Sequence, residues 1–400
     1  MSGASLEILI DRSGSWFRAA AVENGVLTDL HCDRDSLATW TDAVVRGRVI
    51  RRGGGGAGKH VDVGLERPGY LEVGSGAKDP AALPALSEGR SFLFQVRADP
   101  SGQGRKGVTL SRDLVLAGRF LAYVPHGQGI QISRRISAAA VRAGLKARLL
   151  AESPALGAQT LSPSASAGAG GGGWAGGWIV RAAARVATPE QIDAEACWLR
   201  HRWRRLAEAA DGPPGVLLPP PDAVERLLRD TAGRPLSRLW LTASVMDKVR
   251  ARLVDGAPDL VPRLEIAEAT LFERHDLEGQ FAALFAEWVS LSGGGSLVIS
   301  PTEALVAVDV NAGPQGNPAA VNREAATALV RQLRLRNLAG MVVVDFLTLP
   351  GRPERVALER HLAAAAASDP AGVQIYGFTA MGLLELTRRR RGPSLATLAV

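Results

Sequence analysis

The chain has 400 residues (42.0 kDa), so at about 150 residues per domain the sequence predicts two or three domains. Its composition, 46% hydrophobic and 22% charged, excludes wholesale disorder, and the absence of an apolar run of about 18 residues excludes a membrane-spanning helix. The 47 basic and 40 acidic side chains give a net charge of +7, which favours a polyanion partner but also occurs in basic proteins that bind no nucleic acid.

The first part of the chain is predicted to be rich in strands. β-rich runs cover Leu6–Ile10 and Trp16–Val22, and Asn24-Gly25 is a tight-turn signal of the kind that joins antiparallel strands. Between residues 42 and 98, short strands alternate with glycine-rich turns. Many short strands separated by glycine turns indicate a small β-barrel.

The middle of the chain is predicted to contain a loop and two capped helices. The segment Ser162–Gly177 consists mostly of Ser, Ala and Gly, which cannot bury a core and therefore favour a mobile loop. Thr188 and Gln191 form a capping-box pattern at the start of one helix, and Asp222 with Glu225 begins a second.

The last third of the chain has the most regular pattern. Strands are expected over Ser296–Ile299, Ala304–Val310 and Met341–Val344, and helices over Asn322–Leu338 and Arg355–Ala366. Strand, helix and strand at this spacing predict a βαβ unit in an α/β or α+β domain.

One motif imitates a nucleotide-binding loop. The run Gly53–Lys59 has the glycines and the lysine of a P-loop, but His60 stands where the magnesium-binding Ser or Thr belongs. The residues after it alternate as a strand and do not open a helix. We therefore interpret the run as a glycine-rich hairpin loop.

Two aspartates are the best candidates for metal chemistry. Asp309 and Asp345 each end an apolar strand, and the helix between those strands makes them plausible neighbours in one sheet. Two carboxylates at adjacent strand ends can hold a magnesium ion, which keeps several of its waters. Asn311 would point the same way as Asp309 and could donate to a phosphate oxygen. The alternative interpretation is that both aspartates are helix caps or turn residues.

Basic residues form two groups in the same region. Arg323, Arg331, Arg334 and Arg336 lie on the helix that joins the two apolar strands, and Arg388–Arg391 form a run near the C-terminus. A charged run is often only a solvated face. Beside a carboxylate metal site, however, such residues favour a phosphodiester substrate.

The cysteines and histidines predict no metal centre. Cys32 and Cys197 have no histidine or cysteine at ligand spacing, so we expect no disulfide framework and no structural zinc. No nucleophile elbow or hydrolase triad is present in the sequence. Glu7, Asp11 and Arg12 interrupt the N-terminal apolar run too early for a secretory signal, and we expect a cytoplasmic protein.

Several segments, in chain order, resemble the ribonuclease E/G family. The resemblance covers nearly the whole chain, is strong over residues 285–395 and is thin over residues 40–90. The matching segments are "AVENGVLTDLHCDRDS" (21–36), "SRRI" (133–136), "GWIVRAAA" (177–184), "GGSLVISPTEALVAVDVNAG" (294–313), "EAATALVRQLRLRNLAGMVVVDF" (324–346) and "MGLLELTRRRRGPSL" (381–395).

The resemblance implies a multidomain α/β and α+β architecture. An RNase H-like subdomain would be split between residues 1–34 and 213–272. A degenerate OB-fold RNA-binding barrel would occupy residues 35–112 and a 5′-sensor-like segment residues 113–212. Residues 273–400 would form a DNase I-like catalytic subdomain.

The resemblance also implies an activity and its residues. Family enzymes cut single-stranded RNA internally, in RNA processing or decay, and leave 5′-phosphate and 3′-hydroxyl ends. Asp309 and Asp345 would hold Mg²⁺, and Asn311 would assist at the scissile phosphate. The candidate RNA-binding residues are Tyr70, Lys106, Arg134, Arg135, Arg181, Arg331, Arg334 and Arg336.

Three departures from the family pattern leave a second function open. Ala182 replaces the threonine that follows the 5′-phosphate-binding arginine, here Arg181, and His60 replaces a barrel aromatic whose companion is Tyr70. The cysteine motif through which larger members bind zinc and pair their chains does not follow the arginine run, so any homodimer would depend on protein packing. An RNA-binding relative with little or no catalysis is therefore the alternative to an endoribonuclease.

Overall fold

The computed structural model describes residues 5–52, 58–72, 86–100, 106–157, 176–268, 270–314 and 317–399. Nearly all of the predicted loop Ser162–Gly177, and residues 53–57 of the glycine run, lie outside these ranges.

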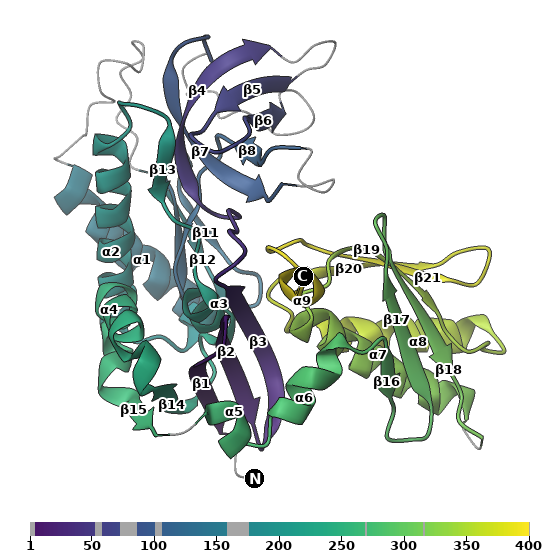
Figure 1. Cartoon of the computed structure of the whole chain (residues 1–400). Coiled ribbons are helices and arrows are strands. Elements are labelled where there is room, and N and C mark those ends of the chain that lie inside the picture. The colour runs from purple at the N-terminus through teal and green to yellow at the C-terminus, as the bar shows by residue number, and fades with distance from the viewer. Residues whose placement is uncertain are drawn as a thin grey trace. The chain divides into compact units, whose positions relative to one another are not determined.

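The chain divides into two units, which are described separately. The first combines Met1–Ala38, Leu236–Val245 and Glu265–Val400, and the second combines Thr39–Pro235 and Met246–Leu264. In Figure 1 the green-to-yellow part of the chain from residue 265 onward belongs to the first unit. No helix in the described part of the chain is long and apolar enough to cross a membrane.

A five-stranded sheet forms one part of the first unit. The predicted tight turn is present, because Asn24 and Gly25 have φ angles of 51° and 74°, and it joins two antiparallel strands. The short helices that complete this part are α5 (Leu271–Arg274), α6 (Glu278–Ala282) and α9 (Leu395–Ala399). In spatial order the strands are β15 (Leu264–Ala267), β14 (Leu236–Thr242), β1 (Leu6–Ser13), β2 (Trp16–Glu23) and β3 (Val26–Arg34).

A six-stranded mixed sheet forms the other part of the first unit. Only β18 and β19 run parallel to each other, and helix α7 (Pro318–Leu335) is the crossover between them, which confirms the predicted βαβ unit. In spatial order the strands are β16 (Trp288–Ser290), β17 (Ser296–Pro301), β18 (Val306–Asn311), β19 (Gly340–Asp345), β21 (Leu384–Arg388) and β20 (Val373–Phe378).

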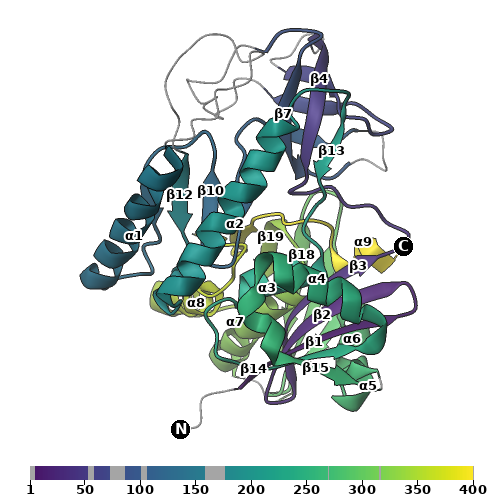
Figure 2. The same ribbon diagram turned by 90° about the vertical axis from the view of Figure 1, so that its left-hand side faces the viewer.

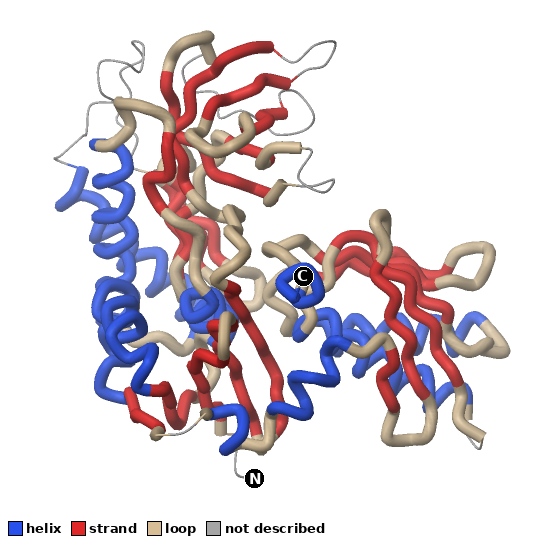
Figure 3. Tube along the Cα trace, in the orientation of Figure 1, coloured by secondary structure: helices blue, strands red, loops and turns tan. Residues whose placement is uncertain are grey.

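Helices α7 and α8 (Arg352–Ala366) cover one face of this sheet (Figures 1 and 3). Alternate strand residues such as Leu297, Val308 and Val344 point to these helices and are buried in one apolar core. The residues between them point to the other face, which we call the open face, and they are half-buried or exposed. This alternation follows from the two-residue period of a strand.

Both helices begin earlier than predicted. Asn317 caps α7 through its side chain, which accepts a hydrogen bond from Ala319 N, and Pro318 occupies the first turn. A proline is favourable there because the first-turn N–H groups have no helical partner. Since Pro353 likewise lies in the first turn of α8, that helix begins at Arg352 and not at Arg355.

The second unit contains a small closed barrel. Strand β4 pairs on one edge with β5 and on the other with β7, so the strands β4, β5, β6, β8 and β7 close on themselves. This barrel confirms the prediction from the alternating short strands. The strands of this sheet are β4 (Val44–Arg52), β5 (Gly58–Asp62), β6 (Gly69–Glu72), β7 (Ser91–Ala98), β8 (Thr109–Ser111) and, paired outside the ring with β4, β13 (Gly215–Leu218).

A four-stranded sheet and four helices complete the second unit. Helices α1 and α2 pack on the sheet (Figure 2), and the predicted capping box of Thr188 and Gln191 begins α2. Asp222 caps α3 as predicted. The strands are β11 (Ile130–Ile132), β12 (Gly177–Val180), β10 (Leu121–Val124) and β9 (Leu116–Ala117), and the helices are α1 (Ala139–Gly157), α2 (Pro189–Glu208), α3 (Ala223–Thr231) and α4 (Met246–Gly256).

The expected mixed α/β fold with a small barrel is therefore confirmed, and the structure shows that the barrel has five strands. The assignment of its parts as RNase H-like, OB-fold, 5′-sensor and DNase I-like subdomains, with their boundaries, stays a prediction.

Candidate active site

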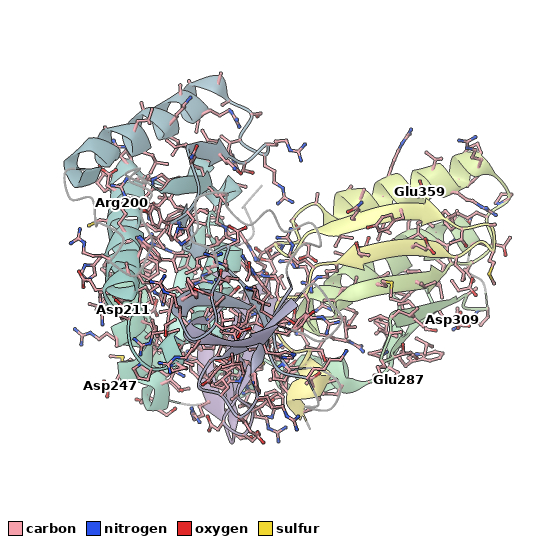
Figure 4. The ribbon with its side chains drawn as sticks, turned by 90° about the horizontal axis from the view of Figure 1, so that it is seen from above. Arg200, Asp211, Asp247, Glu287, Asp309 and Glu359 are labelled. Atoms are coloured by element: carbon pink, nitrogen blue, oxygen red, sulfur yellow. The ribbon has the colours of Figure 1, made fainter. Side chains whose placement is uncertain are left out.

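The two candidate metal-binding aspartates lie side by side. In the parallel pairing of β18 and β19, Asp309 is the direct partner of Asp345, and both side chains are exposed on the open face. Directly paired residues of neighbouring strands lie about 5 Å apart, so the two carboxylates can share one ligand. Figure 4 shows Asp309 on the sheet and Glu359 on helix α8, which lies on the opposite side of the strands.

Asn311 holds one of these carboxylates in place. Its amide Nδ2 donates a 2.9 Å hydrogen bond to Oδ2 of Asp309. Asn311 is half-buried, so the amide lies beside the carboxylate pair and its oxygen stays available for a second contact.

The glycines around Asn311 are required by close backbone contacts. A Cβ on Gly313 would lie 1.3 Å from the carbonyl oxygen of Gly294, and one on Gly295 would lie 2.6 Å from the carbonyl oxygen of Asn311. Both distances are far inside van der Waals contact, and backbone atoms cannot move away cheaply. The glycine-rich turn between β16 and β17 therefore packs directly on the strand end that carries the site.

A charged side chain fixes the same turn. Glu324 of α7 accepts hydrogen bonds from Ser292 Oγ at 2.6 Å and from Gly293 N at 3.0 Å. The hydrogen bond from Ser292 is the main reason that the pKa of Glu324 lies below its usual value. The ionised carboxylate thus connects the helix to the turn beside Asn311.

Asn322 supports the second aspartate, and the sequence alone did not single it out. This fully buried residue of α7 donates from Nδ2 to the carbonyl oxygen of Leu347 at 2.8 Å and accepts from Leu347 N at 3.0 Å. The double contact fixes the chain two residues beyond Asp345. A polar residue on the apolar face of the predicted helix was the signal that could have revealed it.

The carboxylate pair fits a magnesium ion. Mg²⁺ binds through one or two carboxylates and keeps several waters, and both aspartates face solvent. Among the described residues, no group of three or more Asp, Glu, His or Cys side chains is arranged to hold a metal. The site therefore offers two protein carboxylates with room for water, as opposed to a closed protein cage.

Arg331 and Arg334 of α7 and Arg336 at its C-cap, three candidate RNA-binding residues, make contacts within the first unit. Arg331 donates from Nη2 to the carbonyl oxygen of Leu27 at 2.9 Å, and Arg334 forms an ion pair with the buried Asp29 of β3. Arg336 is buried and donates from Nε to Gln332 at 2.7 Å. Burial lowers the pKa of Arg331 and of Arg336. Arg331 and Arg334 thus join α7 to the neighbouring sheet, and the role of all three arginines in RNA binding stays a prediction.

The candidate residues of the barrel lie close to one another. Tyr70 of β6 pairs directly with His60 of β5, and their rings meet edge to face with centroids 5.7 Å apart. Lys106 is exposed in the segment that leads into β8, which pairs with β6 at Tyr70. The barrel therefore brings an aromatic ring, an imidazole and a lysine to one region of its surface.

The remaining candidate arginines also come together. Arg134 and Arg135 follow β11, Arg181 follows β12, and these two strands are parallel neighbours. Arg134 and Arg135 are exposed, whereas Arg181 is half-buried and donates from Nη1 to the carbonyl oxygen of Gly118 at 2.6 Å.

A buried carboxylate supports the loop that Arg181 contacts. Glu195 accepts hydrogen bonds from the backbone N–H groups of Arg119 and Phe120, the latter at 2.8 Å. Burial is the main reason that its pKa is raised. Ala182, next to Arg181, begins a short 3-10 helix and offers no hydroxyl group.

The fold and the carboxylate pair define the class of protein: a multidomain α/β protein with a barrel and a two-carboxylate site suited to a divalent cation. The model of the Ribonuclease E/G family matches residues 115–391, and the chain therefore belongs to this family. The expected family and the expected enzyme class, an endoribonuclease, are confirmed by this membership.

The individual relatives are named ribonuclease G or ribonuclease E. Ribonuclease G of Escherichia coli K12 is 27% identical over 97% of this chain and 81% of its own length. Ribonuclease E of a Nostoc species is 30% identical over 80% of this chain and 45% of its own length. Ribonuclease E of Haemophilus influenzae is 28% identical over 94% of this chain and 41% of its own length.

Proposed function

We propose that this protein is a magnesium-dependent endoribonuclease that cleaves single-stranded RNA and leaves 5′-phosphate and 3′-hydroxyl ends, in RNA processing or decay. The observation that carries the proposal is the direct pairing of Asp309 with Asp345 on the open face of an α/β sheet. We propose that these two carboxylates hold the ion.

In this proposal the aspartates and Asn311 have different roles. Asp309 and Asp345 would hold a magnesium ion, which would supply a Lewis acid for the phosphodiester and would lower the pKa of bound water. Asn311 orients Asp309 through its amide and offers a neutral hydrogen-bonding group beside the scissile phosphate. Because both aspartates are exposed, an extended RNA strand can reach them without an opening of the fold.

We propose that the RNA backbone is bound through exposed cations of the second unit. Lys106, Arg134 and Arg135 are exposed and can pair with phosphates, and Arg181 can contribute from its half-buried position. Tyr70 can stack on a base. Phosphate contacts of this kind position RNA without reading its sequence.

The proposal is tested by incubating the protein with an end-labelled single-stranded RNA in Mg²⁺ and in excess chelator. We expect internal cleavage only with Mg²⁺, and products whose new 5′ ends are phosphorylated, as shown by a phosphate-dependent 5′-exonuclease. Binding without cleavage in Mg²⁺ would favour the alternative, an RNA-binding relative with little or no catalysis.

We expect cleavage to depend only weakly on the 5′ end of the RNA. The family pattern pairs the arginine with a threonine, but Ala182 cannot donate a hydrogen bond to a 5′-phosphate. A hydrogen bond to a charged group contributes about 1.5–3 kcal/mol, so its loss should reduce the preference for a 5′-monophosphate over a 5′-hydroxyl by about tenfold or more.

The measurement is the ratio of the cleavage rates of the two forms of one RNA. Ala182→Thr is the matched variant, and it should raise the ratio. A large 5′-monophosphate preference in the unaltered protein, left unchanged by Ala182→Thr, would contradict the prediction.

A further inference from the structure

Two exposed aromatic side chains lie on the open face at opposite edges of the six-stranded sheet. Trp288 on the edge strand β16 is 58% exposed, and Tyr376 on the edge strand β20 is 59% exposed. A tryptophan or tyrosine this exposed leaves a large apolar surface in water, and a ring with its face free is a natural stacking surface.

The register of the strands places Trp288 in line with the carboxylate pair. Trp288 pairs with Val298, Val298 with Asp309, and Asp309 with Asp345. Directly paired residues point to the same face, so Trp288 shares the open face with both aspartates. Its neighbour Val289 instead packs on the helix-covered core. Two strand spacings, about 10 Å, separate Trp288 from Asp309.

Tyr376 points to the same face on the other side of the sheet. Ile375 and Phe378 both pack against the core under the helices although they are three residues apart, because the register shifts between Ile375 and Gly377. Gly377 has a φ of +99°, and a Cβ on it would point toward Glu359 of α8. Because Ile375 points to the core and successive strand residues alternate, Tyr376 points away from the helices.

Only strand β21 lies between the strand of Tyr376 and the strand of Asp345. The register places Tyr376 beside Glu385, which pairs with Val343, so Tyr376 is two strand spacings across and two residues along the strand from Asp345, about 12 Å, on the side opposite Trp288. Glu385 of β21 lies between them on the open face, opposite Val343. A carboxylate at this position repels phosphate groups, so a strand of RNA that crosses here should turn its bases, and not its backbone, toward the sheet.

We propose that Trp288 and Tyr376 each stack on a nucleobase of the RNA substrate, one on either side of the scissile phosphate. This inference rests on the proposed endoribonuclease function, which places that phosphate at Asp309 and Asp345. An RNA strand then crosses the β-strands of the open face, and the two rings hold it on both sides of the carboxylate pair. Stacking is tolerant of sequence because every base has a π face, so the two contacts fix the position of the strand without selecting its bases.

The test uses a short single-stranded RNA that carries one 2-aminopurine, placed in turn at each position of the strand, and the scissile bond is mapped on the same RNA in Mg²⁺. The fluorescence of 2-aminopurine falls when the base stacks. With the full-length protein in chelator, where the RNA stays intact, we expect quenching at one position on each side of the scissile bond. Trp288→Ala should abolish quenching on one side only, and Tyr376→Ala on the other side only. Each substitution should weaken RNA binding by about tenfold.

Matched variants separate stacking from a change in folding. Trp288→Phe and Tyr376→Phe keep a ring and should keep most of the quenching. Val254→Ala removes a comparably exposed apolar side chain, 58% exposed on α4, and should change neither quenching nor affinity.

The outcomes distinguish this inference from the proposed function. If both alanine variants quench as the unaltered protein does, or if both affect the same nucleotide, the stacking assignment is wrong even when the protein cleaves RNA. If the unaltered protein quenches at two positions in chelator but never cleaves in Mg²⁺, the endoribonuclease proposal fails while the two stacking contacts remain. A protein that binds no RNA would overturn both.

Discussion

Asp345→Asn is expected to reduce RNA cleavage by at least about 100-fold, a loss of the size seen when a key electrostatic group is removed from an active site. The substitution is nearly isosteric but removes one of the two charges that the proposed magnesium ion needs. Because Asp345 is exposed, the free energy of unfolding should change by less than about 0.5 kcal/mol. Asp309→Asn should behave in the same way.

The measurement compares single-turnover cleavage rates with urea unfolding of the same preparations. Glu303→Gln is the matched control, because it neutralises an exposed carboxylate in the turn before β18 and should leave cleavage unchanged. If the aspartates were only turn residues, Asp345→Asn would lower stability and leave the activity per folded molecule intact. Turnover near that of the unaltered protein in a stable Asp345→Asn variant would overturn the catalytic assignment.

Arg388→Ala is expected to destabilise the protein by about 3–5 kcal/mol, the range found when one partner of a buried ion pair is removed. Its side chain is 4% exposed and donates from Nε to Oδ2 of the fully buried Asp369 at 2.8 Å. It also donates to the carbonyl oxygen of Leu338 at 3.0 Å and so joins β21 to the segment after α7. The variant would leave the carboxylate of Asp369 buried without its cation.

Urea unfolding of the full chain measures this loss. Arg390→Ala is the matched control, because it removes an exposed arginine from the same run and should change the free energy of unfolding by less than about 0.5 kcal/mol. Equal effects of the two substitutions would show that the run is a uniformly solvated face and that the buried pair is not important for stability.

The local features of the fold could be read from the sequence. Asn24-Gly25 specified a tight turn because both residues tolerate positive φ, and Thr188 with Gln191 specified a helix start because each side chain satisfies a free backbone N–H of the other residue. The apolar strands that end at Asp309 and Asp345, with a helix between them, were enough to predict a βαβ unit with two neighbouring carboxylates. In each case the interactions connect residues that are close in the chain or belong to one repeating pattern.

Only the tertiary structure decided which arginines are structural and which surfaces are open. Arg388 and Arg390 belong to one run, yet the first is buried on Asp369 and the second is exposed, because Arg388 is the last residue of β21 and points to the core side of the sheet, whereas Arg390 lies beyond the end of the strand. Arg334 forms its ion pair with Asp29, 305 residues away in the sequence, which no local pattern can indicate. The places of Trp288 and Tyr376 beside the carboxylates likewise depend on strand order and register, which are fixed by pairing between distant segments.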